Sequence, residues 1–497
     1  MKHARGVAAG VSCLMAATCA VSTFSCADSG KSEGEGSISN TDIGGMGSVA
    51  GPVGQAVGGT GAVLAGAGGS SGSLTAGTTG AITTRAPGGS AGNVGSSDTG
   101  GTNAGGGSGA SAGRSAGTDS NGTAEWSETF PTFTKHEIAS FNSGYSTVVV
   151  DIDGDGLQDI VALSSGSDGL VWFKNPEWTR STITHAPKLI HAAPYDVDGD
   201  GDVDLAVASD FDMNDTIGGG TLVWAEAPAD PTASEEWTLH DVGAIPTSHR
   251  VAWADMDGDG RKELIDLPIF GEGSMGAAHE GAVLLTAFAM PSDPSAAWTS
   301  TVIDDTHLET AHGLRIVDWD GDERDDILTA ANDGVDLFRP ALGMGAERLG
   351  AGAEGQAPDK GSSEVALGKL GDTRFIAAIE PWHGSDAVIY MPGASASDLW
   401  TREVLGSDFE HGHGLALADF DGDGFDEVVG GGGQGDMAEI VYRFVPSTRS
   451  WERIELDMGS VAVSGLDVGD INGDGSPDIV AIGSSPTNNV VWYENSR

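Results

Sequence analysis

Six short acidic segments with the same internal spacing recur along the last three-quarters of this 497-residue chain. The first reads Asp-Ile-Asp-Gly-Asp-Gly-Leu-Gln-Asp from Asp151, and the others begin at Asp196, Asp255, Asp318, Asp419 and Asp470. Each carries oxygen-bearing side chains at positions 1, 3, 5 and 9, and Ca²⁺ takes about six to eight oxygen ligands. Solvated acidic turns alone do not explain one spacing kept six times. The pattern therefore predicts repeated calcium-binding loops.

The loops mark a longer repeat that begins near Glu125. Its units start at positions 151, 196, 255, 318, about 368, 419 and 470, and the unit near 368 has Gly368 and Leu370 where the others have carboxylates. Each unit reads as four short strands, for example 414–418 before a loop, 159–163 after one, 171–173 with aromatic residues, and 178–183 beginning at a tryptophan. We assign the recurring tryptophans to packing between units. Seven units of this kind predict an all-β, seven-bladed β-propeller with four-stranded blades.

The two ends of the repeat region are expected to pair. The last unit stops at Arg497, directly after its third strand, and residues 133–138 match the pattern of the missing fourth strand. An N-terminal strand in that place would join the first and last blades and leave no open sheet edge. The ring is therefore expected to close.

The N-terminal quarter has a different composition. Lys2 and Arg5 precede an uncharged, modestly apolar run, so residues 1–26 predict a secretory signal peptide. Cys26 resembles a lipoprotein cysteine without the usual preceding leucine, which leaves a lipid anchor open. Residues 27–124 are rich in Gly, Ser, Ala and Thr and predict a disordered linker, followed by the propeller at 125–497. We expect an exported protein, extracellular or on the cell surface.

Charge and cysteine content narrow the choice of partners. The formal net charge is −49, from 73 acidic against 24 basic residues. This excludes nucleic acids and anionic lipid surfaces as expected partners, because both are bound by clustered Lys and Arg. All three cysteines lie at or before position 26, so the repeat region has no disulfide and no cysteine nucleophile. We expect a monomer whose partner is a carbohydrate or a cell-surface ligand.

The Asp-x-Asp-Gly-Asp-Gly-x-x-Asp loop followed by Ile-Val-Ala resembles the FG-GAP and VCBS-type repeats of calcium-binding seven-bladed propellers, and integrin α-subunit heads carry similar loops. The resemblance implies up to six Ca²⁺ ions. By position, the implied side-chain ligands are Asp151, Asp153, Asp155 and Asp159; Asp196, Asp198, Asp200 and Asp204; Asp255, Asp257, Asp259 and Glu263; Asp318, Asp320, Asp322 and Asp326; Asp419, Asp421, Asp423 and Glu427; and Asp470, Asn472, Asp474 and Asp478. In the fourth loop Glu323 replaces the usual glycine, which departs from the family pattern.

Histidines are expected on the face opposite these loops. His249, His312 and His413 each lie six residues before the first Asp of their unit, and Tyr145 has this place in the first unit. In a four-stranded blade this position is where the chain enters the innermost strand, so the four side chains should meet around the axis. With His383 they are our candidate catalytic residues, because imidazole acts as acid, base or metal ligand near neutral pH. The candidate ligand-binding residues around them are Arg250, His279, Glu309, Arg315, Glu380 and Trp382.

Two segments, 248–255 and 379–384, also resemble the propeller part of fungal aldos-2-ulose dehydratase. This resemblance implies dehydration or isomerisation of a sugar derivative, although the chain has no room for the cupin domains of the fungal enzyme. Seven-bladed polysaccharide lyases, which use His and Tyr for β-elimination, are a second precedent. Our leading expectation is a calcium-loaded propeller that binds a ligand, in first place a carbohydrate, at the His-lined face. The alternatives are a sugar lyase, dehydratase or isomerase at that face, and an adhesion module without catalysis.

Overall fold

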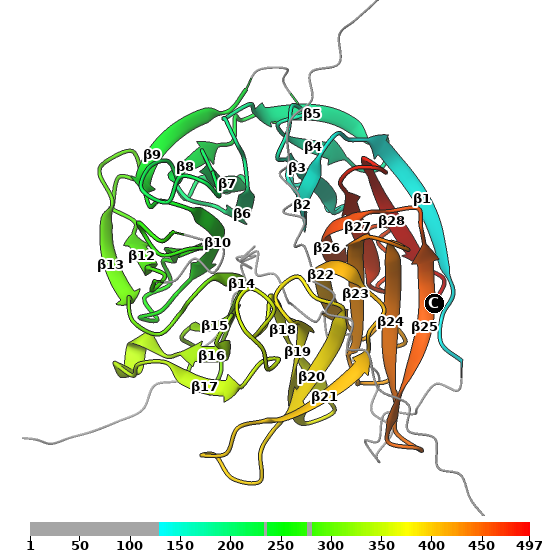
Figure 1. Cartoon of the computed structure of the whole chain (residues 1–497). Helices are drawn as coiled ribbons and strands as arrows, with labels where there is room; N and C mark the ends of the chain where they lie inside the picture. Colours follow the sequence, from blue (N-terminus) through cyan, green and yellow to red (C-terminus); the bar gives the residue numbers. More distant parts are fainter. Residues whose placement is uncertain (1–128, 233–235, 276–280) are drawn as a thin grey trace, which may run out of the picture. The chain divides into compact units, whose positions relative to one another are not determined.

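The computed structural model describes residues 129–232, 236–275 and 281–497. They form seven four-stranded antiparallel sheets arranged as blades around one axis (Figure 1). The predicted all-β, seven-bladed propeller is confirmed. The predicted signal peptide and linker lie outside the described residues and remain predictions. Among the described residues, no helix is both long and apolar enough to cross a membrane.

The blades follow the chain in order, and each runs from an innermost to an outermost strand. Blade 1 contains β2 (Gly144–Val150), β3 (Asp159–Ser164), β4 (Leu170–Lys174) and β5 (Thr179–Thr184). Blade 2 contains β6 (His191–Tyr195), β7 (Asp204–Ser209), β8 (Thr221–Glu226) and β9 (Thr238–Ala244). Blade 3 contains β10 (Ser248–Ala254), β11 (Glu263–Pro268), β12 (Leu285–Ala289) and β13 (Thr299–Asp304). Blade 4 contains β14 (Ala311–Val317), β15 (Asp326–Ala331), β16 (Gly334–Phe338) and β17 (Glu347–Gly350), with a short 3₁₀ helix at Pro340–Leu342.

The remaining blades complete the ring. Blade 5 contains β18 (Glu364–Leu370), β19 (Thr373–Glu380), β20 (Asp386–Met391) and β21 (Thr401–Gly406). Blade 6 contains β22 (Glu410–Ala418), β23 (Glu427–Gln434), β24 (Ala438–Val445) and β25 (Ser450–Met458). Blade 7 contains β26 (Val463–Gly469), β27 (Asp478–Gly483) and β28 (Asn489–Asn495), and its outermost strand is β1 (Phe133–Ser140). The pairing of β1 with β28 confirms that the N-terminal strand completes the last blade.

The hydrophobic core is divided among the seven contacts between neighbouring blades. One buried cluster joins Val161 and Trp172 of blade 1 to Leu205 of blade 2, and a corresponding cluster lies at each following contact. The cluster around Phe141 and Val480 joins blade 7 back to blade 1. The second strands β3, β7, β15 and β27 are buried along their whole length, because both of their faces contact a neighbouring blade. The tryptophans at the fourth strands pack in these clusters, as the sequence predicted.

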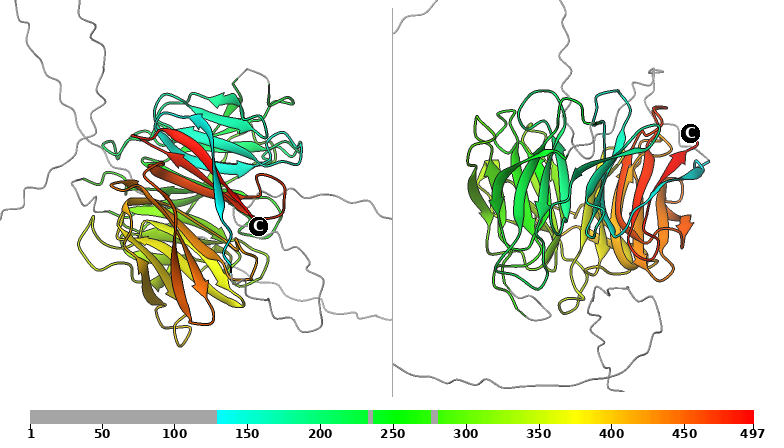
Figure 2. Two further views of the ribbon diagram at one scale, coloured as in Figure 1. Left: turned by 90° about the vertical axis from the view of Figure 1, so that its right-hand side faces the viewer. Right: turned by 90° about the horizontal axis from the view of Figure 1, so that it is seen from above.

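The strand order gives the propeller two distinct faces, seen edge-on in the right-hand view of Figure 2. Loops between first and second strands, such as 151–158, lie on one face, which we call the acidic-loop face. Loops that lead into each first strand lie on the other face, which we call the axial histidine face. The two expected sites therefore lie at opposite ends of the same strands.

Candidate functional site

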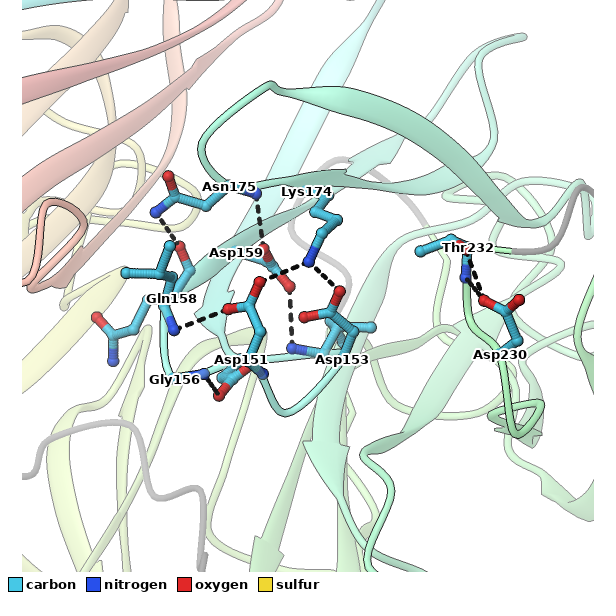
Figure 3. A network of polar contacts seen from close by, with 12 residues as sticks. Asp151, Asp153, Gly156, Gln158, Asp159, Lys174, Asn175, Asp230 and Thr232 are labelled. Carbon is cyan, nitrogen blue, oxygen red and sulfur yellow. Dashed lines mark hydrogen bonds and ion pairs between the residues drawn. The ribbon is translucent and has the colours of Figure 1, made fainter.

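The acidic loops share one backbone path, shown for the first loop in Figure 3. The Asp151 carboxylate accepts hydrogen bonds from the backbone N–H of Asp155 at 3.2 Å and of Gly156 at 2.9 Å. Gly154 and Gly156 have φ values of 69° and 89°, a region in which residues with a Cβ are strained. Glu323 takes the corresponding place in the fourth loop at φ 67°, and its N–H still reaches Asp318 Oδ2 at 3.3 Å. The departure from the family pattern therefore leaves the backbone path intact.

The carboxylates of these loops converge. Ligand atoms of three acidic residues lie within 4.8 Å of one another in the loops that begin at positions 151, 196, 255 and 318. Like charges this close repel unless a cation or a proton is present. In blade 5 a tight hairpin at Leu370 and Thr373 replaces the loop, as expected for the unit without carboxylates.

The ninth residue of each loop has a structural role that the sequence did not reveal. Asp159 accepts the N–H of Ile152 at 3.1 Å through Oδ2 and the N–H of Asn175 at 2.8 Å through Oδ1. The equivalent Asp204 and Asp478 make the same two contacts in blades 2 and 7. Burial raises the pKa of Asp159 and of Asp204 to about 7. In these three blades the carboxylate therefore ties the loop to the end of the third strand, and Glu263, Asp326 and Glu427 make the first of the two contacts in the other blades.

One position beside the loops differs in charge between blades. Lys174, at the end of the third strand of blade 1, forms an ion pair with Asp153 (Figure 3). It also lies 2.6 Å from Asp155. Arg443 has the same place in blade 6 and lies 2.6 Å from Asp421. In blades 2 and 7 the residues at this place are Glu226 and Glu494. Arg339 has this place in blade 4, where its charge acts on Asp326. Three loops thus have a protein cation next to them, and two have an additional carboxylate.

The axial histidine face is assembled by a repeated β-bulge. In blades 1, 3, 4, 6 and 7 the pairing between the first and second strands shifts register at one place, where the first strand has an extra residue. In the order of these blades, the extra residues are Tyr145, His249, His312, His413 and Ser464. A bulge leaves its extra residue out of the strand pairing and redirects its side chain. The positions found from their distance to each acidic loop are therefore the bulge positions that face the axis.

Three imidazoles meet there in an arrangement that suits a metal ion. One ring nitrogen from each of His312, His383 and His413 lies within 4.8 Å of the corresponding nitrogens of the other two rings. The Nε2 atoms of His312 and His383 are 3.0 Å apart. His413 Nδ1 lies 2.6 Å from the carbonyl oxygen of Ser464, which only accepts, so Nδ1 carries the hydrogen and Nε2 has the free lone pair. Zinc and similar ions bind neutral imidazole nitrogens at about 2.0–2.1 Å. The three rings therefore fit such an ion.

A second group adjoins these three rings. The Tyr145 hydroxyl lies 2.8 Å from His249 Nε2, and the two rings of His249 and His312 are 4.6 Å apart between centroids. The Arg250 guanidinium lies over the Tyr145 ring at 5.6 Å and reaches Glu364 Oε1 at 3.2 Å. Glu364 Oε1 is also 2.8 Å from His312 Nδ1. Side chains from blades 1, 3, 4, 5 and 6 thus form one cluster, which we call the axial cluster.

Burial keeps the imidazoles of the axial cluster neutral. Desolvation, together with the nearby charge of Arg250, lowers the pKa of His249, His383 and His413 well below the ordinary value and lowers that of His312 as well. Burial alone would raise the pKa of Glu364, but His312 and the Arg250 guanidinium beside it lower this pKa well below its ordinary value. Desolvation raises the pKa of the Tyr145 hydroxyl. The cluster thus contains neutral bases, one guanidinium and one carboxylate.

The other predicted residues are distributed differently. Trp382 stacks on His383 at 4.1 Å and lies at the edge of the cluster. Glu309 is exposed and pairs with Lys360 at 3.5 Å. Arg315 donates to the Leu314 carbonyl at 2.9 Å rather than to the histidines. Glu380 is fully buried inside blade 5 between Ser362, Tyr390 and Arg402, so it does not line the cluster. His279 lies outside the described residues.

Glu364 and His411 were not singled out as site residues from the sequence. His411 is exposed, and its ring lies 4.6 Å from that of His383. Glu364 belongs to the unit that has no acidic loop, so the spacing from a loop did not point to it. Its one sequence signal is a lone carboxylate in the otherwise apolar first strand of that unit, Glu-Val-Ala-Leu.

The comparisons with known proteins agree with this architecture. Residues 151–207 and 419–481 match the model of the FG-GAP-like repeat. The chain is therefore a seven-bladed β-propeller with FG-GAP-like repeats. Residues 219–393 match the model of the aldos-2-ulose dehydratase β-propeller domain, and this part contains His249, His312, Glu364 and His383. No curated protein matches the chain.

Solved structures match the chain at low identity. The crystal structure of BBS1N in complex with ARL6DN, soaked with mercury, is 12% identical, with 74% of this chain and 98% of that chain covered and a TM-score of 0.48. Rhamnogalacturonan lyase PL11 of Bacillus licheniformis is 14% identical over 73% of this chain and 74% of its own, with a TM-score of 0.40. The Cps50 (Swd1) β-propeller domain of Myceliophteria thermophila is 9% identical over 73% and 99%, with a TM-score of 0.43. These similarities do not distinguish among functions.

Proposed function

We propose that the axial cluster binds a divalent transition-metal ion and, with it, a carbohydrate-derived ligand. The observation that carries this proposal is the convergence of His312, His383 and His413, with the Nε2 lone pair of His413 left free by its bond to Ser464. Imidazole ligands favour zinc over calcium or magnesium. An ion held by these three rings would leave a coordination position for an oxygen of the ligand and would polarise a carbonyl group there.

Two observations support a carbohydrate-derived ligand: the chemical groups in the axial cluster and the match to a family model. A metal ion beside Arg250 and neutral imidazoles suits a ligand with hydroxyl and carbonyl oxygens. The part of the chain that contributes most of the cluster is similar to the propeller domain of an enzyme named for its action on aldos-2-uloses. Trp382, at the edge of the cluster, is partly exposed and stacks on His383, so an aromatic side chain of the kind that packs against sugar rings lies beside the site.

A second candidate function, dehydration of the bound sugar, rests on Tyr145 and His249. Their 2.8 Å contact forms an acid–base pair beside the three rings, and His249 Nδ1 is buried without a hydrogen-bond partner. In an elimination, a base removes the proton from the carbon next to a carbonyl group. The hydroxyl on the following carbon then leaves with a proton as water, and a carbon–carbon double bond forms. The pair could accept the first proton and donate the second, without a change of oxidation state.

We further propose that the acidic loops bind Ca²⁺ as structural ions and that the protein is exported, on the surface or in the medium. The support for calcium is the convergence of carboxylates in loops that share one backbone path. The support for export is the N-terminal sequence and the millimolar calcium outside cells, which would fill even weak sites. In this proposal the calcium ions stabilise the blades, and the axial cluster binds the ligand.

The test begins with the calcium-saturated protein and zinc or cobalt alone. We expect one ion per chain at the axial cluster, and for cobalt the visible absorption of a four-coordinate site. The loaded protein is then offered aldos-2-uloses and a glycan array, and the ultraviolet absorbance of conjugated products is followed. Binding without absorbance supports the carbohydrate-binding module, and binding with absorbance supports the dehydratase. A protein that takes up calcium but neither zinc, cobalt nor any sugar refutes both and leaves the adhesion module.

A further inference from the structure

Glu364 lies at the centre of the axial cluster although its blade has no acidic loop. It is the first residue of β18, only 4% exposed, and its Oε1 atom contacts side chains from two other blades. His312 Nδ1 of blade 4 is 2.8 Å away, and Arg250 Nη2 of blade 3 is 3.2 Å away. One carboxylate oxygen therefore joins blades 3, 4 and 5 at the axis.

The contact with His312 determines which nitrogen of that ring is available. The Glu364 carboxylate lies 2.8 Å from His312 Nδ1, although the ring is not aligned for a full hydrogen bond. A lone pair on Nδ1 would repel the carboxylate at this distance, so Nδ1 must carry the hydrogen. The Nε2 lone pair of His312 is then left toward His383 Nε2, 3.0 Å away. Ser464 has the same effect on His413 through its carbonyl oxygen. The two buried rings, His312 and His413, thus both offer an Nε2 lone pair at the place where the three imidazoles converge.

Through its contact with Arg250, Glu364 also links the three converging histidines to the Tyr145–His249 pair. The guanidinium lies over the Tyr145 ring at 5.6 Å and within 3.4 Å of His249 Nε2. Without a carboxylate partner, a guanidinium that is 7% exposed would be a buried unpaired charge. Glu364 therefore holds the cation that lies beside Tyr145 and His249.

We propose that Glu364 is the positioning residue of the axial cluster, which fixes the Nδ1–H tautomer of His312 and anchors Arg250 beside the Tyr145–His249 pair. This inference rests on the proposed metal site for its effect on affinity, but its effect on the tautomer does not need the metal. Carboxylates that orient metal-binding histidines typically contribute about 10–100-fold to metal affinity. Glu364 itself does not contact the ion or the ligand.

The test compares Glu364→Gln with Glu439→Gln. Glu439 is equally buried and is bonded to the Tyr493 hydroxyl, but it lies in blade 6 away from the cluster, so it controls for the loss of a buried carboxylate. Nitrogen-15 NMR of the histidine rings reads the tautomer of His312 without metal, and a zinc titration reads affinity. We expect the parent and Glu439→Gln to show the Nδ1–H tautomer, and Glu364→Gln to lose it and to bind zinc about 10–100-fold more weakly.

The outcomes separate the two proposals. If Glu364→Gln keeps the Nδ1–H tautomer and binds zinc within a few-fold of the parent, the positioning role is overturned. A parent protein that binds no zinc refutes the metal site, while the tautomer measurement still decides for or against Glu364. Should Glu364→Gln not fold, Glu364→Asp retains the charge but moves the carboxylate back by one methylene. It should then bind zinc more weakly than the parent protein does, and an unchanged tautomer and affinity in this variant overturn the role as well.

Discussion

The two faces of this propeller are built by different rules. On the acidic-loop face one nine-residue pattern recurs six times, and each copy uses residues close together in the chain. On the axial histidine face the cluster occurs once, and its side chains come from blades 1, 3, 4, 5 and 6. Repetition suits a role in holding blades, whereas a cluster that no single blade could form suits recognition of one ligand. If this division is correct, the two faces respond to different ions, variants and pH.

The largest expected effect is the loss of stability when calcium is removed. An ion that binds only the folded protein at 100 times its dissociation constant stabilises it by about 2.7 kcal/mol per site. With several loops occupied, we expect a chelator to lower the melting temperature by more than about 10 °C. Calcium should restore it more fully than magnesium, and zinc should not restore it. An unchanged melting curve after verified metal removal would contradict a structural role for the loops.

The second expected effect concerns the opposite face. Replacing His312 and His383 with Ala removes two of three imidazole ligands, so zinc affinity should fall by more than about 100-fold and sugar binding should be lost. The calcium-dependent rise in melting temperature should stay nearly the same, because the loops lie at the other end of the strands. The double variant Asp196→Asn and Asp200→Asn is the matched control, with reduced calcium response and normal zinc binding. Loss of both responses in either double variant would show that the faces are not independent.

The sequence was more informative about the acidic-loop face than about the axial histidine face. The acidic loops could be located from the sequence, because every predicted ligand lies within nine residues and the pattern repeats, but the contact from the ninth residue to the end of the third strand had no such signal. The bulge residues at the axis were predicted from their distance to the loops, since that distance is set by the length of the first strand. Glu364 could not be found in this way because its unit lacks a loop. Glu380 and Arg315 were expected near the cluster, but Glu380 is buried inside blade 5, and Arg315 donates to the carbonyls of Leu314 and, at 3.4 Å, of Leu415 in blade 6. Contacts between distant strands have no local sequence signal.

A third, smaller effect should appear in acid. The folded-state pKa values of His249 and His413 lie below the value of about 6.5 of the unfolded chain, so below that pH the unfolded state binds more protons. Stability must therefore fall as the pH decreases from about 6.5 toward the folded-state values, by up to about 1.4 kcal/mol per pH unit for each histidine. We call this fall in the free energy of unfolding the acid limb. It should be smaller in the His249→Gln and His413→Gln double variant. The measurement is urea unfolding between about pH 4 and 8 in saturating calcium.

Other groups in the molecule act in the opposite direction and serve as an internal comparison. Burial raises the pKa of Asp266 to about 7, above its unfolded value, so the folded state keeps a proton there that the unfolded state has lost. Its contribution to stability is complete below the unfolded pKa and is lost as the pH rises toward about 7. Asp266→Asn should therefore remove this opposing slope between about pH 4 and 7 and make the acid limb steeper. An acid limb unchanged in the histidine variant would contradict the assignment to the axial face.

The smallest expected effect distinguishes loops within the acidic face. Lys174 forms ion pairs with two predicted ligands of the first loop, whereas Glu226 has the same place beside the second. A bound Ca²⁺ must displace the Lys174 ammonium, so Lys174→Met should strengthen calcium binding at the first loop by a few-fold, equivalent to about 1 kcal/mol. Glu226→Gln should weaken the second loop by a similar factor, since it removes a nearby negative charge. Calcium titrations followed by NMR of Gly156 and Gly201 would report the two loops separately. Equal affinities in the parent protein, unmoved by either change, would mean that the residue after the third strand does not tune the loops.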